Sequence, residues 1–498
     1  MRRSLAAAVC AGTAALVLAP AAPALAHPTD ALPPTLPFDV TYSKTDNLEH
    51  LGRFPEHAGT AGGTPSEDGT LFYLTDPRGV YVYDTRKPED PKLLGSVRLF
   101  QTTTGAALAQ EDPDTDGNIL VVDGSSNPAT GAALTVVDVS QPSAPKVVGS
   151  LPGTTDHTWT CVSAEVEGER NGCAYVYGRT GHVVDLRDPT KPKRVADWRQ
   201  ATGYGTQSQQ YTHDLTEIRP GLVMTAGATA MLMDTSDPEA PVRLTEITPV
   251  ERFTTLGYHS VEWARGGRDR WVVTGTEIAP PALPQLPAAT ANTAGSDCQG
   301  SQSVIETWDA RQVLDALDAY EVDRDPAVFE GVAFTRADTY DASGRGLFLD
   351  GKAPASQLYC AHWMELNPQF KNGGLMAVAY YNRGTRFVEV DSKTGGMTEV
   401  AWITPAEGYT GSPQWVADDL VYVMDYRRGM EIVRILPEEA TRVVHNAADV
   451  IAPASSAAQL PPLHLHGREL AAGAAVLLLV GLVAVERVVR RRTALRTA

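Results

Sequence analysis

Cysteine and positive charge are both scarce in this chain of 498 residues. It has five cysteines and a formal net charge of −18, with 42 Lys and Arg against 60 Asp and Glu. A domain this acidic repels phosphate backbones, so the charge argues against nucleic acid as a partner. No Cys-x-x-Cys spacing occurs, which argues against a thiolate metal site.

Several common catalytic signatures are also missing. The chain has no Gly-x-Ser-x-Gly elbow, no phosphate-binding loop and no His-Glu-x-x-His helix. Glycine (43) and proline (35) are abundant instead, which predicts many turns and few long helices. Hydrophobic residues make up 43% and charged residues 20%, so the composition is that of a globular protein.

The N-terminus has the three-part layout of a secretory signal. Arg2 and Arg3 precede an apolar stretch, and small residues suited to cleavage follow at Ala24-Leu25-Ala26. We therefore expect a signal peptide over residues 1–26 and an N-terminal lead-in over residues 27–46. The arginine pair leaves both the Sec route and the twin-arginine route of export open.

The C-terminus has the composition of a membrane anchor. Residues 470–485 form a run of 16 apolar residues, which predicts a transmembrane helix over residues 469–489. Arginines follow, so residues 490–498 are expected to form a basic cytoplasmic tail. A flexible stalk is expected at 437–468. This layout places the main domain outside the cell, held to the cell membrane by a single pass.

Four cysteines remain beyond the signal peptide. An even number in an oxidising compartment predicts two disulfides. Cys161 and Cys173 flank a turn-like segment, so we expect them to bridge neighbouring strands. Cys298 and Cys360 are then paired by elimination.

A repeated motif organises the middle of the chain. Each intact copy is a β-rich run closed by Asp-x-x-x-Pro-x-x-Pro, and the four aspartates are Asp84, Asp138, Asp185 and Asp234. The aspartate can bond the following backbone in an Asx-turn, and the prolines force the next strand to begin beyond them. The aspartates lie 54, 47 and 49 residues apart, which is the size of one propeller blade.

These repeats predict an all-β, seven-bladed β-propeller over residues 47–436, because each has four strand-like runs and no amphipathic helices between them. The last blade lacks an outer strand. Residues 47–54 have the pattern of one, so we expect this N-terminal strand to close the ring. Two insertions interrupt the pattern, at 278–303 and 310–357, and a short helix is expected within the latter at Arg311–Tyr320.

The four intact units resemble those of the LVIVD-repeat family, bacterial and archaeal surface proteins with a propeller fold. The resemblance covers about residues 47–436. It implies a surface-located repeat protein and offers no catalytic residue to transfer. A more distant similarity is to selenium-binding and methanethiol-oxidase propellers, which also use histidines. It implies a functional role for histidines in this chain.

Four consecutive blades carry a histidine at the head of their first strand: His157, His213, His259 and His362. First strands open on one rim of a propeller's channel, so the four imidazoles can converge on a common space. Neutral imidazoles suit copper, zinc or iron. In the alternative interpretation, each histidine is a brace that bonds the backbone of the neighbouring blade.

Acidic and tyrosine residues accompany these histidines. They are candidates to orient the ligands or to act as general bases at the same mouth, and they are Asp214, Glu262, Glu365, Tyr211 and Tyr258. His57 of blade one has a different context and stays outside the set.

An acidic pattern in blade two resembles an EF-hand loop. Asp112, Asp114 and Asp116 alternate before a glycine, and Asp123 stands at the twelfth position. This spacing suggests a calcium site. The alternative is a tight hairpin whose aspartates suit its turns.

Two hypotheses of function follow. The leading one is a membrane-anchored extracellular propeller that acts as a binding or interaction module for an unknown protein or small-molecule ligand. The alternative is a metal-dependent enzyme, an oxidase, that uses one transition-metal ion held by the histidine cluster.

Overall fold

The structure is a computed structural model, and it describes residues 42–60, 62–99, 111–123, 132–153, 156–204, 212–248, 257–277, 304–342, 361–381, 383–405, 408–437 and 443–446. All of them belong to the first of two compact units, Met1–Ser455; the other is Ser456–Ala498. The predicted signal peptide, the predicted membrane helix, Cys298 and Cys360 lie outside the described residues. Within the ranges given above, no helix is long and apolar enough to cross a membrane.

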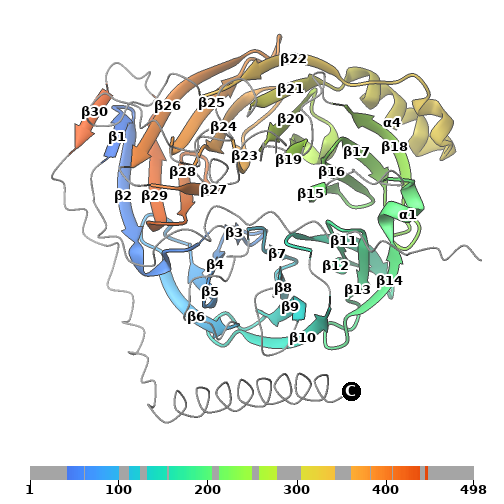
Figure 1. The fold of residues 1–498 in the computed structure, drawn as a ribbon, viewed down its shortest axis with the longest axis horizontal. Helices are drawn as coiled ribbons and strands as arrows, with labels where there is room; N and C mark the ends of the chain where they lie inside the picture. The colour runs from blue at the N-terminus through green and yellow to red at the C-terminus, as the bar shows by residue number, and fades with distance from the viewer. Residues whose placement is uncertain are drawn as a thin grey trace, which may run out of the picture. The chain divides into compact units, whose positions relative to one another are not determined.

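Seven antiparallel sheets follow one another around a common axis, as Figure 1 shows. Each sheet is one blade, and its first strand lies innermost. The strands of blade one are β3 (Gly62–Pro65), β4 (Leu71–Asp76), β5 (Gly79–Asp84) and β6 (Lys92–Arg98). Those of blade two are β7 (Asp114–Thr115), β8 (Ile119–Asp123), β9 (Ala132–Asp138) and β10 (Lys146–Pro152). Those of blade three are β11 (Trp159–Val166), β12 (Glu169–Gly178), β13 (His182–Asp185) and β14 (Lys193–Asp197).

Short helices accompany blades four and five. Blade four follows α1 (Trp198–Thr202) and contains β15 (Thr212–Arg219), β16 (Leu222–Gly227), β17 (Ala230–Asp234) and β18 (Val242–Ile247). Blade five contains β19 (Tyr258–Trp263), α2 (Ala264–Gly267), β20 (Trp271–Thr276), β21 (Ile305–Asp309), α4 (Arg311–Asp323), η3 (Pro326–Phe329) and β22 (Thr335–Tyr340). The helix expected at Arg311–Tyr320 is therefore confirmed as α4.

The last two blades combine strands from both ends of the described chain. Blade six contains β23 (Met364–Leu366), β24 (Gly374–Ala379), β25 (Thr385–Val390), β26 (Met397–Pro405), β1 (Tyr42–Thr45) and β30 (Val443–Asn446). Blade seven contains β27 (Thr410–Ala417), β28 (Leu420–Asp425), β29 (Gly429–Ile435) and β2 (Leu48–Phe54), which leads through η2 (Pro55–His57) into blade one. Blade six thus draws strands from both segments that flank the repeats.

Strand β2 closes the ring as the sequence predicts. It pairs antiparallel with β29, from Leu48 opposite Ile435 to Phe54 opposite Met430. Apolar clusters fill all seven interfaces between blades, including the one between blades seven and one, where Phe54 packs with Tyr83. The prediction of an all-β, seven-bladed propeller closed by an N-terminal strand is confirmed for the described residues.

The repeated Asp/Pro motif turns the chain and joins the blades. In each copy the aspartate Oδ1 accepts a hydrogen bond of 2.7–3.0 Å from the backbone N–H two residues on, at Asp84, Asp138, Asp185 and Asp234. The expected Asx-turns are therefore confirmed. The proline segment then packs on the outer strand of the preceding blade. A Cβ at Gly149 would lie 2.1 Å from the Pro189 carbonyl oxygen, so this close approach requires glycine.

One expected insertion is wrong in part. The sequence pattern predicts an interruption of the blade at residues 310–357, but this segment contains β22, the outer strand of blade five. Strand β22 has the sequence TRADTY and is mostly exposed. An outer strand with one open face needs no apolar alternation, so hydrophobic periodicity does not reveal it.

The disulfide between Cys161 and Cys173 is present and joins β11 to β12, as predicted. The two cysteines are 12 residues apart, and cross-linking a loop of this size stabilises a fold by about 3 kcal/mol. We expect the double variant Cys161→Ser/Cys173→Ser to lose about that much in a thermal melt. Adding reductant should lower the melting temperature of the wild type more than that of the variant, which keeps only the expected Cys298–Cys360 pair; equal sensitivity of both proteins would contradict a structural bond between Cys161 and Cys173.

Candidate metal centre at the propeller axis

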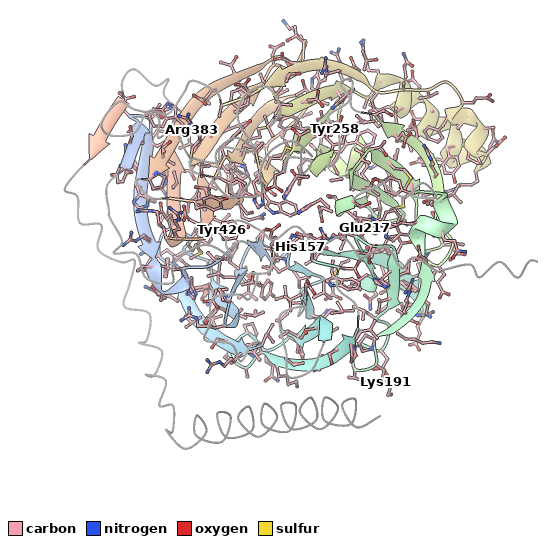
Figure 2. All side chains as sticks on the ribbon, in the orientation of Figure 1. His157, Lys191, Glu217, Tyr258, Arg383 and Tyr426 are labelled. Carbon is pink, nitrogen blue, oxygen red and sulfur yellow. A yellow bond between two sulfur atoms is a disulfide. The ribbon has the colours of Figure 1, made fainter. Side chains whose placement is uncertain are left out.

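The structure brings the four predicted histidines together at the centre of the ring. His157 lies just before β11, His213 in β15, His259 in β19 and His362 just before β23. Successive ring centroids are 5.2, 3.6 and 4.2 Å apart. His157 lies near the axis in Figure 2. The expected convergence of imidazoles from four consecutive blades is therefore confirmed.

Strand bulges and a left-handed backbone conformation direct three of these side chains toward the cluster. In β15 and β19 the histidine is the extra residue of a register shift against the next strand, at His213 and at His259. Such bulges rotate a side chain out of the strand's regular alternation. His157 has a φ of 68°, in the left-handed region, and its backbone N–H donates to Asp123 Oδ2 at 3.1 Å. Backbone in this region costs free energy and is common at functional sites.

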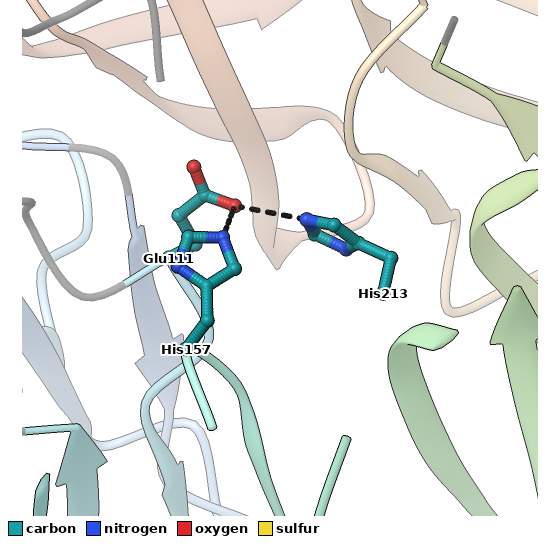
Figure 3. Close-up of side chains that lie close together, drawn as sticks. All are labelled: Glu111, His157 and His213. Atoms are coloured by element: carbon teal, nitrogen blue, oxygen red, sulfur yellow. Dashed lines mark hydrogen bonds and ion pairs between the residues drawn. The ribbon is translucent and has the colours of Figure 1, made fainter. Parts of the chain in front are cut away.

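A buried carboxylate, that of Glu111, lies among the four rings. Its Oε2 is 3.1 Å from His157 Nε2 and 3.6 Å from His213 Nε2, as Figure 3 shows. The same oxygen is 4.0 Å from His259 Nε2, and Oε1 is 3.7 Å from His362 Nε2. Glu111 precedes the first strand of blade two, the place where the next four blades carry histidine. This positional equivalence was the signal that sequence reasoning missed.

The two nitrogens of the imidazoles have different roles. His213 Nδ1 is 3.2 Å from the carbonyl oxygen of His259, and His362 Nδ1 is 2.5 Å from that of Gly411. A carbonyl can only accept, so Nδ1 carries the proton in both rings, and in the neutral ring Nε2 offers a lone pair toward Glu111. In His213 and His362, Nδ1 therefore braces the backbone of the neighbouring blade, and Nε2 faces Glu111 as the candidate ligand atom. The two interpretations apply to different nitrogens of the same ring.

A second carboxylate and two phenols complete the cluster. Glu277 Oε2 is 3.5 Å from His259 Nε2, and its Oε1 accepts a 2.5 Å hydrogen bond from Tyr381. Tyr426 donates to Glu111 Oε1 at 2.7 Å. Burial and the neighbouring carboxylates raise the pKa of both tyrosines well above its usual value, so both phenols stay neutral donors. None of these residues was singled out from the sequence.

Four carboxyl residues lie one to three positions after Glu111 and three of the histidines in the chain. Asp214, Glu262 and Glu365, expected near the ligands, interact electrostatically with Asp112. Burial raises the pKa of all four, that of Glu365 to about 8. These groups therefore hold protons more tightly than exposed carboxylates do.

The expected tyrosines and His57 do not join the cluster. Tyr258 packs in the apolar core between blades four and five, where its hydroxyl donates to Glu306 at 3.2 Å; this corrects the expectation that it lines the mouth. Tyr211 lies outside the described residues. His57 bonds Asp76 and Tyr83 within blade one, which agrees with leaving it out of the set.

The four aspartates of the EF-hand-like pattern serve different partners. Asp114 Oδ2 accepts from the backbone N–H of Cys161 at 2.8 Å, and Asp116 Oδ1 accepts two backbone bonds of 2.9 Å within the β7–β8 hairpin. Asp123 bonds His157, and Asp112 interacts with Asp214. The geometry favours the hairpin interpretation over a calcium loop.

A carboxyl group outside the histidine cluster gives a testable pH dependence. Desolvation raises the pKa of Glu217 from 4.5 to about 7, although Ser163 donates two hydrogen bonds to it. Between these values the folded protein keeps a proton that the unfolded chain has released, so stability falls as pH rises from about 4.5 to 7. The contribution is at most about 3 kcal/mol.

Glu217→Gln should therefore flatten this part of the stability profile. Thermal melts between pH 5 and pH 8 measure the effect, with Glu389→Gln, the same change at an exposed position of β25, as the control. A Glu217→Gln profile that parallels the wild type would show that another group controls this pH range.

Comparison with known proteins identifies no family for this chain. No protein-family model matches the sequence, and no curated protein matches it. Among solved structures, the RRP9 WD40 repeats align with 80% of this chain and 99% of theirs, at 10% identity and a TM-score of 0.48. Raptor from Chaetomium thermophilum aligns with 80% of this chain and 30% of its own, at 9% identity and a TM-score of 0.46. The sheet order of this chain is itself what defines the propeller.

Proposed function

We propose that this protein is a transition-metal-dependent propeller enzyme whose metal centre is formed by His157, His213, His259 and His362 with Glu111. One observation carries the proposal: four imidazole Nε2 atoms surround one buried carboxylate, at 3.1 to 4.0 Å. Rings whose Nδ1 donates to a carbonyl offer a lone pair, and lone pairs facing a carboxylate form a site that a cation fits.

The donor set suits copper, zinc or iron, because imidazole and carboxylate ligands are common to all three. The protein's own contribution is orientation. Backbone carbonyls fix two of the rings, Tyr426 fixes Glu111, and Tyr381 fixes Glu277. A bound metal would supply Lewis acidity or redox chemistry. An oxidase is the reaction class to test first, because copper and iron, two of the metals that suit this donor set, both support redox chemistry.

Metal analysis of the purified full-length chain tests the proposal. We expect at least one equivalent of copper, zinc or iron per chain, retained through gel filtration. Oxidase activity is then assayed with the same metal loaded. Protein that retains no transition metal after loading would overturn the metal-dependent function.

The second candidate is a binding module at the cell surface, exported by the N-terminal segment and anchored by the C-terminal one. A closed ring is a rigid support for binding loops, and the helix α4 of blade five lies on the outer rim of the ring (Figure 1). We propose that the propeller lies outside the cell. Protease added to intact cells should then degrade the propeller; protection until the cells are lysed would contradict this location.

A further inference from the structure

The ligand atoms of the centre divide into overlapping groups. Among the described residues, three sets each offer ligand atoms within 4.8 Å of one another: Glu111 with His157 and His213; Glu111 with His259 and His362; and His213 with His259 and Glu277. Glu111 is shared by the first two sets. None of these three sets contains all four histidines.

One ion is too small to bind all four rings in this arrangement. Metal–nitrogen bonds of about 2.0–2.1 Å keep any two ligand atoms of one ion within about 4.2 Å of each other. The rings come from four consecutive blades, so they form an arc. His157 and His362, at the ends of this arc, belong to different sets.

The Glu111 carboxylate has the orientation of a bridge. Its Oε2 lies 3.1 and 3.6 Å from His157 and His213 and, farther off, 4.0 Å from His259, whereas its Oε1 faces His362 at 3.7 Å. A carboxylate that bridges two ions gives one oxygen to each, and ions in such pairs lie about 3.5–4 Å apart. Glu277, beside His259, adds a ligand on the second side. The two carboxylates also offset the charge of two cations in a buried setting.

We infer that the centre holds two metal ions bridged by Glu111, one bound by His157 and His213 and the other by His259 and His362 with Glu277. The inference rests on the proposed metal-dependent function and specifies its nuclearity. A pair of ions about 3.5–4 Å apart can hold both oxygens of one small substrate. The substrate class that fits is therefore a small oxygen-bearing molecule, such as a carboxylate or dioxygen.

Copper titration of the metal-free full-length chain tests the pair. After loading with Cu(II) and gel filtration, the wild type should keep two equivalents. His157→Ala and His362→Ala should each keep one, because each removes a ligand of a single ion. His182→Ala, a histidine that pairs with Asp156 in blade three, should keep two. Copper kept by His213→Asn/His362→Asn, in which both ions lose a ligand, measures binding outside the centre and is subtracted.

The outcomes separate the pair from the proposed function. A wild type that keeps one copper, with His157→Ala and His362→Ala unchanged, would place a single ion between His213, His259 and Glu277. That result would overturn the pair and the assignment of His157 and His362 as ligands, and it would leave the metal-dependent function standing. A wild type that keeps no more copper than the double variant would overturn the metal-dependent function.

Electron paramagnetic resonance gives another readout that does not depend on alanine variants folding well. Two bridged Cu(II) ions couple, so the signal per bound copper should be weak in the wild type. Glu111→Gln has the same shape but cannot bridge, and its copper should give a full single-ion signal. A full signal in the doubly loaded wild type would overturn the bridge.

Discussion

Replacing both His213 and His362 by asparagine should remove the metal while leaving the metal-free fold close to wild-type stability. The asparagine amide N–H2 can donate to the carbonyls of His259 and Gly411 as Nδ1 does. Its side chain ends short of the Nε2 position, so the ligand atoms are lost. Each ion of the inferred pair loses a ligand, so metal content should fall to background.

Alanine at the same two positions is the matched comparison. It removes the ligands and also the hydrogen bonds to the neighbouring blades, so each substitution should cost about 1–3 kcal/mol. Thermal melts must compare metal-free proteins, because a bound ion itself stabilises the folded state. If the asparagine variant has the same melting temperature as the alanine variant, the hydrogen bonds of Nδ1 to the neighbouring blades contribute little to stability. If the asparagine variant keeps its metal, His213 and His362 are not ligands.

Phe54→Ala should be the most destabilising single substitution in the ring closure. Phe54 is 1% exposed at the end of β2, and it packs against Tyr83 of blade one while its strand pairs with β29 of blade seven. Truncating a buried phenylalanine costs about 3–5 kcal/mol. Here the cavity also weakens the junction between the first and last blades.

Chemical denaturation measures this effect, with Leu94→Ala as the control. Leu94 lies on the outer strand of blade one and is 38% exposed, so its truncation should cost less than about 1 kcal/mol. Similar losses in the two variants would mean that β2 is not an integral strand of blade seven.

The sequence predicts the propeller because the Asp/Pro motif, with the same local interactions, occurs in four intact copies. An aspartate ends a strand and prolines delay the next one, and this holds at Asp84 as at Asp234. Blade five lacks that motif, and its outer strand β22 is polar, so neither signal marks it. Strands β1 and β30 were missed because each is four residues long and gains meaning only from its partners in blade six.

The candidate site was predictable only in part for a geometric reason. Histidines at the same position of successive repeats must converge if the repeats form a ring, so their meeting follows from the fold. Glu111 takes the place of the histidines in blade two, so a comparison of the repeats could have found it. Glu277 and Tyr426 approach the same point from positions that no repeat marks, and only the three-dimensional structure reveals this. The bulges at His213 and His259 also follow from pairing between strands, which no single-strand pattern encodes.

The pairing of β2 with β29 also imposes a delay on folding during biosynthesis. Because Leu48 of β2 lies opposite Ile435 of β29, β2 cannot pair until β29 has been synthesised. At 5–20 residues per second, translation of the intervening chain takes about 20–80 seconds. During that interval β2 has no partner strand and the apolar face of blade one that blade seven covers stays exposed, and both invite aggregation. A cell that makes this protein therefore has to shield the nascent chain until its last blade leaves the ribosome.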